Sequence, residues 1–238
     1  MRSRALIAAF SCCCCLIPSL DQAAFPQDPT QDATVHGKIS VIHSSKAEHT
    51  SAEVVVWLTP KQPQPLPAPA TGAMLVQKNK SFSPHVLAVL QGTEVEFPNH
   101  DPFFHNVFSI YQGKPFDLGL YESGSSKRIK FVRPGVSYIF CNIHPEMSAV
   151  VVVLTTPYFA MTAADGSYSI AHVRPGSYRL QVWYELASET ELASATQELV
   201  VKSRDTSISS ITLHSSDGHK DHLNKYGEAY PVGKPQSY

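Results

Sequence analysis

The sequence predicts an all-β protein in which a Greek-key sandwich is inserted into, or packed on, a second small β-sandwich. Two observations support this prediction. Short apolar segments with period-two alternation are separated by turns rich in Gly, Pro, Ser and Asp, and few segments show helical spacing over more than two turns. The chain has 238 residues, 43% of them hydrophobic, which is enough for one large or two small cores.

The predicted strands form three groups along the chain. The first pair precedes a proline-rich run, the second group follows that run, and the third group follows Pro157. The strands are 36–43 and 53–58 in the first group; 86–90, 94–97, 105–110, 128–132, 136–141 and 149–154 in the second; and 159–162, 168–170, 178–184, 197–201 and 207–213 in the third.

Two of these strands also predict their surroundings. In residues 136–141 the period of two places Ile139 and Cys141 on the same face, beside core residues. Residues 149–154 are apolar on both faces. Such a strand either lies centrally with an aliphatic outer face or is covered on that face by a second module.

The N-terminal segment, residues 1–24, is typical of a secretory signal peptide, because Arg2 and Arg4 precede an apolar stretch that ends near Ala23. The stretch is short for a bilayer span and polar residues follow it. We therefore expect an exported protein, periplasmic or extracellular, without a transmembrane span in its mature form. Retention of the segment as an anchor and lipidation at Cys12 are the alternatives.

Removal of this segment leaves Cys141 as the last of the five cysteines, since the other four occupy positions 12–15. A single cysteine in an exported protein pairs with another molecule, packs as a small apolar residue or serves as a thiolate ligand. The chain carries 19 Lys and Arg against 20 Asp and Glu, so that no charge excess predicts a nucleic acid as partner. No motif predicts a hydrolase, and we expect no enzymatic activity.

Residues 141–147, Cys-Asn-Ile-His-Pro-Glu-Met, place a thiolate, an imidazole and a thioether in one short loop. A second imidazole, that of His105, lies at the start of a predicted strand of the same sandwich. A His₂Cys plane with a weak axial Met suits copper that cycles between Cu(I) and Cu(II). The sequence therefore predicts one mononuclear copper ion bound by His105, Cys141, His144 and Met147.

The C-x-x-H-x-x-M loop, the segment Phe104-His105-Asn106-Val107 and the run 92–97 resemble the cupredoxin family, and the loop is most similar to that of amicyanin. The resemblance covers roughly residues 77–155. We place a cupredoxin-like domain at residues 74–155, after a proline-rich linker at 61–73. The resemblance implies a type 1 (blue) copper site and outer-sphere electron transfer to a redox partner protein.

Several outer residues of the site follow from the same resemblance. It implies that Asn99 hydrogen-bonds near Asn142 and ties the two ligand segments together, and a turn role for Asn99 is the alternative. Ile143 stands where amicyanin and plastocyanin have proline. Its N–H predicts a second amide hydrogen bond to the sulfur of Cys141, which favours Cu(I) and raises the reduction potential.

We expect electrons to leave the site through the edge of His144, and we predict an apolar rim around it that contacts the redox partner. The residues that form it are Phe103, Phe104 and Pro145. Core packing is the alternative role of these side chains.

The segments 165–170 and 175–180 resemble the carboxypeptidase regulatory-like family of transthyretin-type sandwiches, and similar elements at 37–41 and 54–58 precede the cupredoxin-like segment. We therefore expect a discontinuous second sandwich of residues 34–60 and 157–214. This module is predicted to act as a scaffold or docking surface. A polar tail at 215–238 is predicted to be disordered.

The sequence thus predicts an exported blue copper protein that carries single electrons. The alternative is an exported copper carrier or sensor without electron traffic. Fast electron self-exchange would favour the first, and rapid release of Cu(I) would favour the second.

Overall fold

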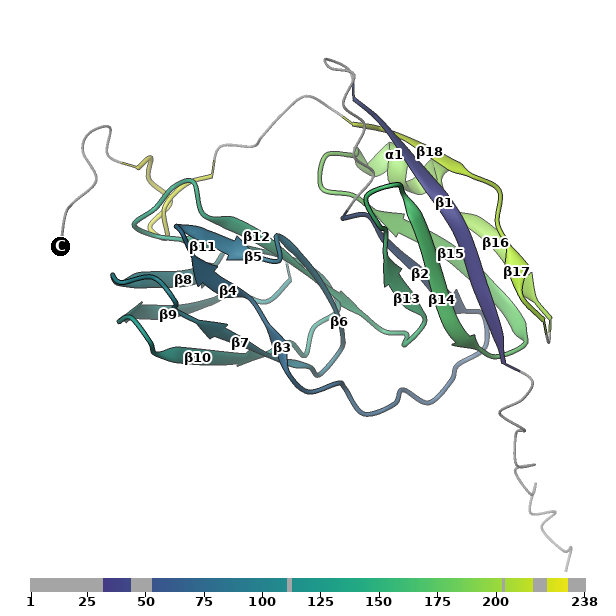
Figure 1. The fold of residues 1–238 in the computed structure, drawn as a ribbon, viewed down its shortest axis with the longest axis horizontal. Helices are drawn as coiled ribbons and strands as arrows, with labels where there is room; N and C mark the ends of the chain where they lie inside the picture. Colours follow the sequence, from purple (N-terminus) through teal and green to yellow (C-terminus); the bar gives the residue numbers. More distant parts are fainter. Residues whose placement is uncertain (1–31, 44–52, 111–112, 203, 216–221, 231–238) are drawn as a thin grey trace, which may run out of the picture.

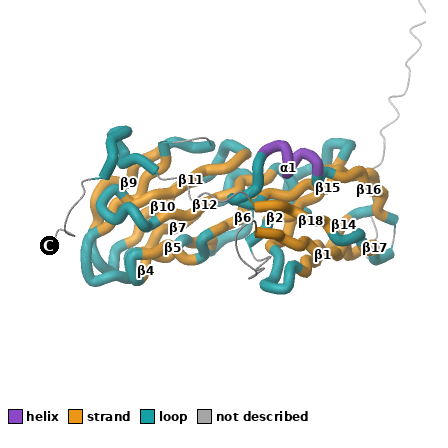
Figure 2. Tube along the Cα trace, turned by 90° about the horizontal axis from the view of Figure 1, so that it is seen from above, coloured by secondary structure: helices purple, strands orange, loops and turns teal. Residues whose placement is uncertain are grey.

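The computed structural model describes residues 32–43, 53–110, 113–202, 204–215 and 222–230. The predicted signal peptide lies outside these residues. Within them the protein is built almost entirely of strands, which confirms the predicted all-β class. Figure 1 shows two groups of strands side by side, and Figure 2 shows the same two groups from above.

The first sandwich contains the strands from β3 to β12. Its larger sheet has the order β6-β12-β11-β8-β9, and a smaller sheet has the order β10-β7-β3. A hairpin of β4 and β5 lies beside them. The strands are β3 (Ala73–Met74), β4 (Val76–Lys78), β5 (Ser81–Ser83), β6 (Val86–Leu90), β7 (Glu94–Pro98), β8 (His105–Ser109), β9 (Phe116–Tyr121), β10 (Ser126–Lys130), β11 (Gly135–Cys141) and β12 (Ser148–Leu154).

The second sandwich combines the first two strands of the chain with those that follow β12. In one sheet β1 lies between β14 on one edge and β17 and β18 on the other, and the second sheet has the order β13-β2-β15-β16. The elements are β1 (Ala33–His43), β2 (Val55–Pro60), β13 (Phe159–Met161), β14 (Ser167–Val173), β15 (Gly176–Trp183), β16 (Gln197–Val201), β17 (Thr206–Ser207), β18 (Ile211–Ser215) and one helix, α1 (Glu189–Ser194).

The connection between β2 and β3 carries the proline-rich run. Residues 61–72 contain no helix or strand. The Gln64 side chain nevertheless packs on the second sandwich, where it donates to the Tyr178 hydroxyl and accepts from the Tyr158 hydroxyl. Within the described residues no helix has the length and apolar character needed to cross a bilayer.

Each sandwich has its own core, and a third apolar cluster lies between the two. On β12 the residues Ala149, Val151 and Val153 face the core of the first sandwich, together with Cys141. Val150 and Val152, on the other face, pack in the third cluster against residues of the second sandwich that include Val55 and Trp183. The two apolar faces of β12 are therefore both buried, and the interpretation that a second module covers its outer face is confirmed.

A partly buried ion pair joins the two sandwiches beside this cluster. Nε2 of His85 lies 2.6 Å from Oε2 of Glu185, and Nδ1 lies 3.1 Å from the carbonyl oxygen of Ser148. Both ring nitrogens thus face acceptors. The hydrogen bond to Glu185 raises the pKa of His85 from its ordinary value of 6.5, although burial opposes this rise.

This pair predicts a pH-dependent stability. Because the pKa of His85 is higher in the folded chain than in the unfolded chain, its contribution is fully present below pH 6.5 and is lost as the pH rises through the raised value. We expect His85→Gln to lower the free energy of unfolding by at most about 1 kcal/mol at about pH 5.5, and by less at about pH 9. Urea titrations of both chains at both pH values measure this difference. An equal loss at the two pH values would contradict the prediction.

Several elements are not predicted from the sequence. Helix α1 has six residues and so is too short to show a helical period, although Ser188 caps it by accepting from the N–H of Glu191. In the β4–β5 hairpin Asn79 and Lys80 adopt left-handed φ angles of 56° and 53°, and the flanking strands have only three residues each. Strand β9 contains Gly119 at φ 65°, which interrupts its alternation.

Candidate metal centre

Three of the predicted ligand residues meet at one end of the first sandwich. His105 begins β8, Cys141 ends β11, and His144 follows in the loop to β12. Because β8 and β11 are antiparallel neighbours, with Cys141 opposite Val107, the start of one strand lies beside the end of the other. This pairing explains how two residues 36 positions apart come into contact.

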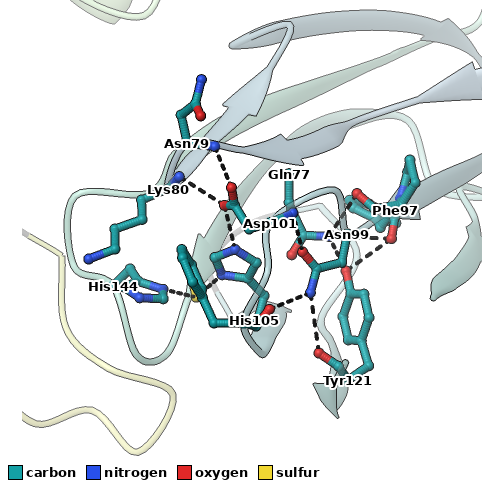
Figure 3. A network of polar contacts seen from close by, with 12 residues as sticks. Gln77, Asn79, Lys80, Phe97, Asn99, Asp101, His105, Tyr121 and His144 are labelled. Atoms are coloured by element: carbon teal, nitrogen blue, oxygen red, sulfur yellow. Dashed lines mark hydrogen bonds and ion pairs between the residues drawn. The ribbon is translucent and has the colours of Figure 1, made fainter. Parts of the chain in front are cut away.

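The contacts among these side chains are between the ligand-type atoms themselves. The Cys141 Sγ lies 3.7 Å from Nδ1 of His105 and 3.6 Å from Nδ1 of His144. Figure 3 shows dashed contacts from both His105 and His144 to a sulfur atom. The three atoms all lie within 4.8 Å of one another, and no other such group of three occurs in the described part of the chain. Cys141 and His105 are fully buried, whereas His144 is half-buried.

Met147, the fourth predicted ligand, closes the loop that Cys141 opens. The N–H of Cys141 donates to the carbonyl oxygen of Met147 at 3.2 Å, and the N–H of Met147 donates to that of His144 at 3.0 Å. The side chain of Met147 is fully buried and belongs to the same core cluster as Cys141. We refer to residues 141–147 as the ligand loop.

Asp101 fixes the ring of His105. Its Oδ2 lies 2.9 Å from Nε2 of His105, and since a carboxylate only accepts, Nε2 carries the proton and the lone pair of Nδ1 points toward the sulfur (Figure 3). The Asp101 carboxylate also accepts from the backbone N–H groups of Asn79, at 2.6 Å, and Lys80, at 2.9 Å. Burial opposes ionisation here, but these hydrogen bonds outweigh it and lower the pKa of Asp101.

Sequence reasoning missed Asp101 as a residue of the site. The available signal was a carboxylate four residues before a predicted ligand histidine. Nothing in the local sequence indicates that the β4–β5 turn supplies two amides to the same carboxylate, because Asn79 and Lys80 are more than twenty residues away.

The predicted bridge between Asn99 and Asn142 is wrong. The Asn99 side chain donates to the carbonyl oxygens of Phe103, at 2.8 Å, and Tyr121, and accepts from the N–H of Asp101. The alternative turn role of Asn99 is therefore the one found. The link between the ligand segments is made by the backbone, since the N–H of Asn142 donates to the carbonyl oxygen of Asn106 at 3.3 Å.

The sulfur of Cys141 is buried and faces several amides. Burial raises the pKa of the Cys141 thiol, and hydrogen bonds from the backbone N–H groups of Asn106, Ile143 and His144 oppose this rise. The amide of Ile143, which the sequence singles out, is thus one of three. Burial also lowers the pKa values of His105 and His144, which favours neutral imidazoles with a free lone pair.

The three rim residues differ in their surroundings. Phe103 is half-buried and its ring contacts those of His105, at 5.3 Å, and His144, at 5.5 Å between centroids. Phe104 is 43% exposed and Pro145 is exposed. Phe103 therefore packs against the site, and the other two are free of the core.

The prediction of a disordered tail is wrong for residues 222–230. These residues lie against the ligand loop, where His222 and Lys225 bond to Pro145 and Asn142. The polar composition of the tail was the reason for the prediction, but its polar groups find partners on the loop. The other residues of the predicted tail beyond Ser215 lie outside the described part of the chain.

Comparisons with known proteins give matches among solved structures only. No family model and no curated protein matches the chain. A purple cupredoxin from Nitrosopumilus maritimus is 26% identical, with 35% of this chain and 100% of that chain covered and a TM-score of 0.32. An oxidised variant of amicyanin is 22% identical, with 36% and 85% covered and a TM-score of 0.33.

A copper-containing nitrite reductase from Thermus scotoductus is 27% identical, with a TM-score of 0.34. The match covers 48% of this chain and 28% of that enzyme. The chain thus spans less than a third of the length of the reductase.

Proposed function

We propose that this protein is an exported type 1 copper protein that carries single electrons and is not itself an enzyme. The observation that supports the proposal is the approach of two imidazole Nδ1 atoms to the buried sulfur of Cys141, at 3.6 and 3.7 Å. The exported location rests on the N-terminal segment of the sequence.

The residues present fit one copper ion. Two imidazoles and a thiolate are the equatorial donors that copper takes in such sites, and a thioether is the usual weak axial donor. His105, Cys141, His144 and Met147 would hold the ion. When bound, copper supplies a couple between Cu(I) and Cu(II).

The chain's own residues supply rigidity. Asp101 holds His105 in one tautomer and orientation, and the backbone bonds of the ligand loop hold Cys141 next to His144. A site whose ligands move little between redox states requires little reorganisation. Such a site favours outer-sphere transfer over ligand exchange, which is why we place electron transport before copper delivery.

The exposed apolar side chains beside His144 would contact the redox partner. Phe104 and Pro145 are exposed, and His144 is the ligand that reaches toward solvent. A small apolar patch suits brief contact with another protein. Phe103 would serve chiefly to hold the two imidazoles.

The second sandwich would act as a scaffold. In this proposal the second sandwich is formed by residues 34–60 and 157–214 and resembles carboxypeptidase regulatory-like domains. The copper domain at 74–155 is inserted between its two parts. The pairing of β2 with β13 and β15, and of β1 with β14, supports this division. The shared cluster around Val150 and Trp183 would hold the two sandwiches together.

Electron self-exchange between the Cu(I) and Cu(II) forms tests the proposed role. We expect the resonances of residues near the site to broaden progressively when a small share of Cu(II) protein is added to the Cu(I) protein, because a rigid site exchanges electrons quickly. The NMR line widths measure this rate. Slow exchange, together with rapid loss of Cu(I) to a chelator, would contradict electron transport and favour copper delivery.

A further inference from the structure

The described C-terminal residues 222–230, which we call the strap, form a small folded unit of their own. The Asn224 side chain accepts from the N–H groups of Tyr226, at 2.9 Å, and Glu228, at 3.0 Å. The N–H of Asn224 donates to the carbonyl oxygen of Glu228 at 2.8 Å. The strap is thus a turn with internal hydrogen bonds, and Figure 1 places it in yellow next to β8 and β11.

Two aromatic residues of the strap bond to carbonyl groups of the ligand loop. The hydroxyl of Tyr230 donates to the carbonyl oxygen of Cys141 at 3.0 Å, and Nε2 of His222 lies 2.7 Å from that of Pro145. The ring of His222 stacks on Phe140 with 4.0 Å between centroids and an angle of 24°. One carbonyl group belongs to the predicted ligand Cys141. The other belongs to Pro145, which directly follows the predicted ligand His144.

Lys225 connects the loop to the strand pair that carries the other histidine. Its N–H donates to Oδ1 of Asn142 at 2.9 Å, and its Nζ bonds to Oδ2 of Asp117 in β9 at 2.8 Å. Oδ1 of Asp117 accepts from Nδ2 of Asn106 at 2.7 Å, and Asn106 follows His105 directly. One strap residue therefore links both segments on which the ligands lie.

The distribution of these contacts separates the strap from ordinary packing of a chain end. Leu223, at 41%, and Tyr226, at 72%, are left in solvent, whereas the rings of His222 and Tyr230 are half-buried. The polar groups of the strap converge on Cys141, Asn142 and Pro145. The stacked ring of His222, the half-buried ring of Tyr230 and the bonds to the loop therefore hold the strap, and its two large exposed side chains contribute little.

We propose that the strap is part of the metal site and that His222, Lys225 and Tyr230 are positioning residues, which act on the ligands through the ligand loop. This inference rests on the proposed copper function. The strap would hold Cys141 and His144 at their spacing in the chain without metal, so that the site is preorganised for the ion.

The test compares Tyr230→Phe with Tyr168→Phe in the full chain. Both variants remove one hydroxyl, but that of Tyr230 bonds to the ligand loop, whereas that of Tyr168, in β14 of the second sandwich, has no hydrogen-bond partner among the described residues. We expect Tyr230→Phe to weaken Cu(I) binding about 10-fold, as is typical when a residue that supports the metal ligands is replaced, and to shift the visible band of the Cu(II) form. Tyr168→Phe should leave both unchanged. A chain that ends at Ser215 should show a larger change in the same direction.

Hydrogen exchange of the metal-free chain separates the strap from the copper function. The amides of Cys141, Asn142 and Met147 are hydrogen-bonded inside or next to the loop. They should exchange about fivefold faster in Tyr230→Phe than in Tyr168→Phe, which is the ratio expected for one lost hydrogen bond.

The outcomes separate the two ideas. If the natural chain binds no copper but the loop amides respond as expected, the proposed function fails and the positioning role of the strap stands. If the natural chain forms a blue site and the two variants match in affinity, band and exchange, the strap inference is overturned.

Discussion

Replacing Cys141 by serine is expected to weaken Cu(I) binding by more than about 100-fold. This loss exceeds the 10- to 100-fold that is typical when a residue that only hydrogen-bonds to a metal ligand is replaced. The serine hydroxyl is a hard and weakly acidic donor, whereas the thiolate is the soft ligand that Cu(I) prefers. Competition with a Cu(I) chelator measures the change. His144→Gln should also weaken binding strongly, since it removes one of the two imidazoles that face the sulfur.

His100→Gln is the matched control for the histidine variant. His100 is exposed and lies five residues before His105, but it is not among the three residues whose ligand atoms converge. Its replacement should leave the copper affinity unchanged. If Cys141→Ser and His144→Gln bound Cu(I) as tightly as His100→Gln does, the assignment of the ligands would be wrong.

Replacing Asp101 by alanine is expected to lower the free energy of unfolding of the metal-free chain by about 2 kcal/mol or more. Asp101 is 3% exposed, and its carboxylate accepts from the His105 ring and the N–H groups of Asn79 and Lys80. The buried His105 ring N–H that loses its partner costs about 1–3 kcal/mol, and the two turn amides, which lie nearer solvent, add less. Copper affinity should fall by about 10- to 100-fold as well, because the His105 ring loses its orientation.

Asp165→Ala is the control for this variant. Asp165 also accepts a backbone hydrogen bond, from Ser167, but it is exposed and lies on the second sandwich. Urea titration should give a loss of less than about 1 kcal/mol for Asp165→Ala. A loss of equal size for the two variants would show that the burial of Asp101 and its three hydrogen bonds add no stability beyond that of an exposed aspartate.

The local patterns in the sequence were sufficient for most strands and for the group of ligand-type residues. Alternation identifies β11 and places Cys141 on its inner face, where the core cluster contains it. The spacing within residues 141–147 brings His144 to the sulfur because both lie in one short loop. His105 follows from its place at the start of a strand.

What the sequence could not supply are contacts between distant segments. Three such contacts join residues that are far apart in the sequence, so that no local pattern indicates them. They are the hydrogen bond from Asn79 to Asp101, the bond from Lys225 to Asp117 and the stacking of His222 on Phe140. Asn99 is instructive, since the resemblance implied a bridge to Asn142 that its turn geometry here does not make. Side-chain partners of this kind depend on tertiary packing.

Addition of Cu(II) to the purified full chain tests the central claim most directly. We expect an intense visible absorption band from charge transfer between the Cys141 thiolate and copper, which saturates at one copper per chain and is absent in Cys141→Ser. A weak, pale spectrum in the natural chain, or a band that persists without the thiol, would contradict a type 1 copper site formed by His105, Cys141, His144 and Met147.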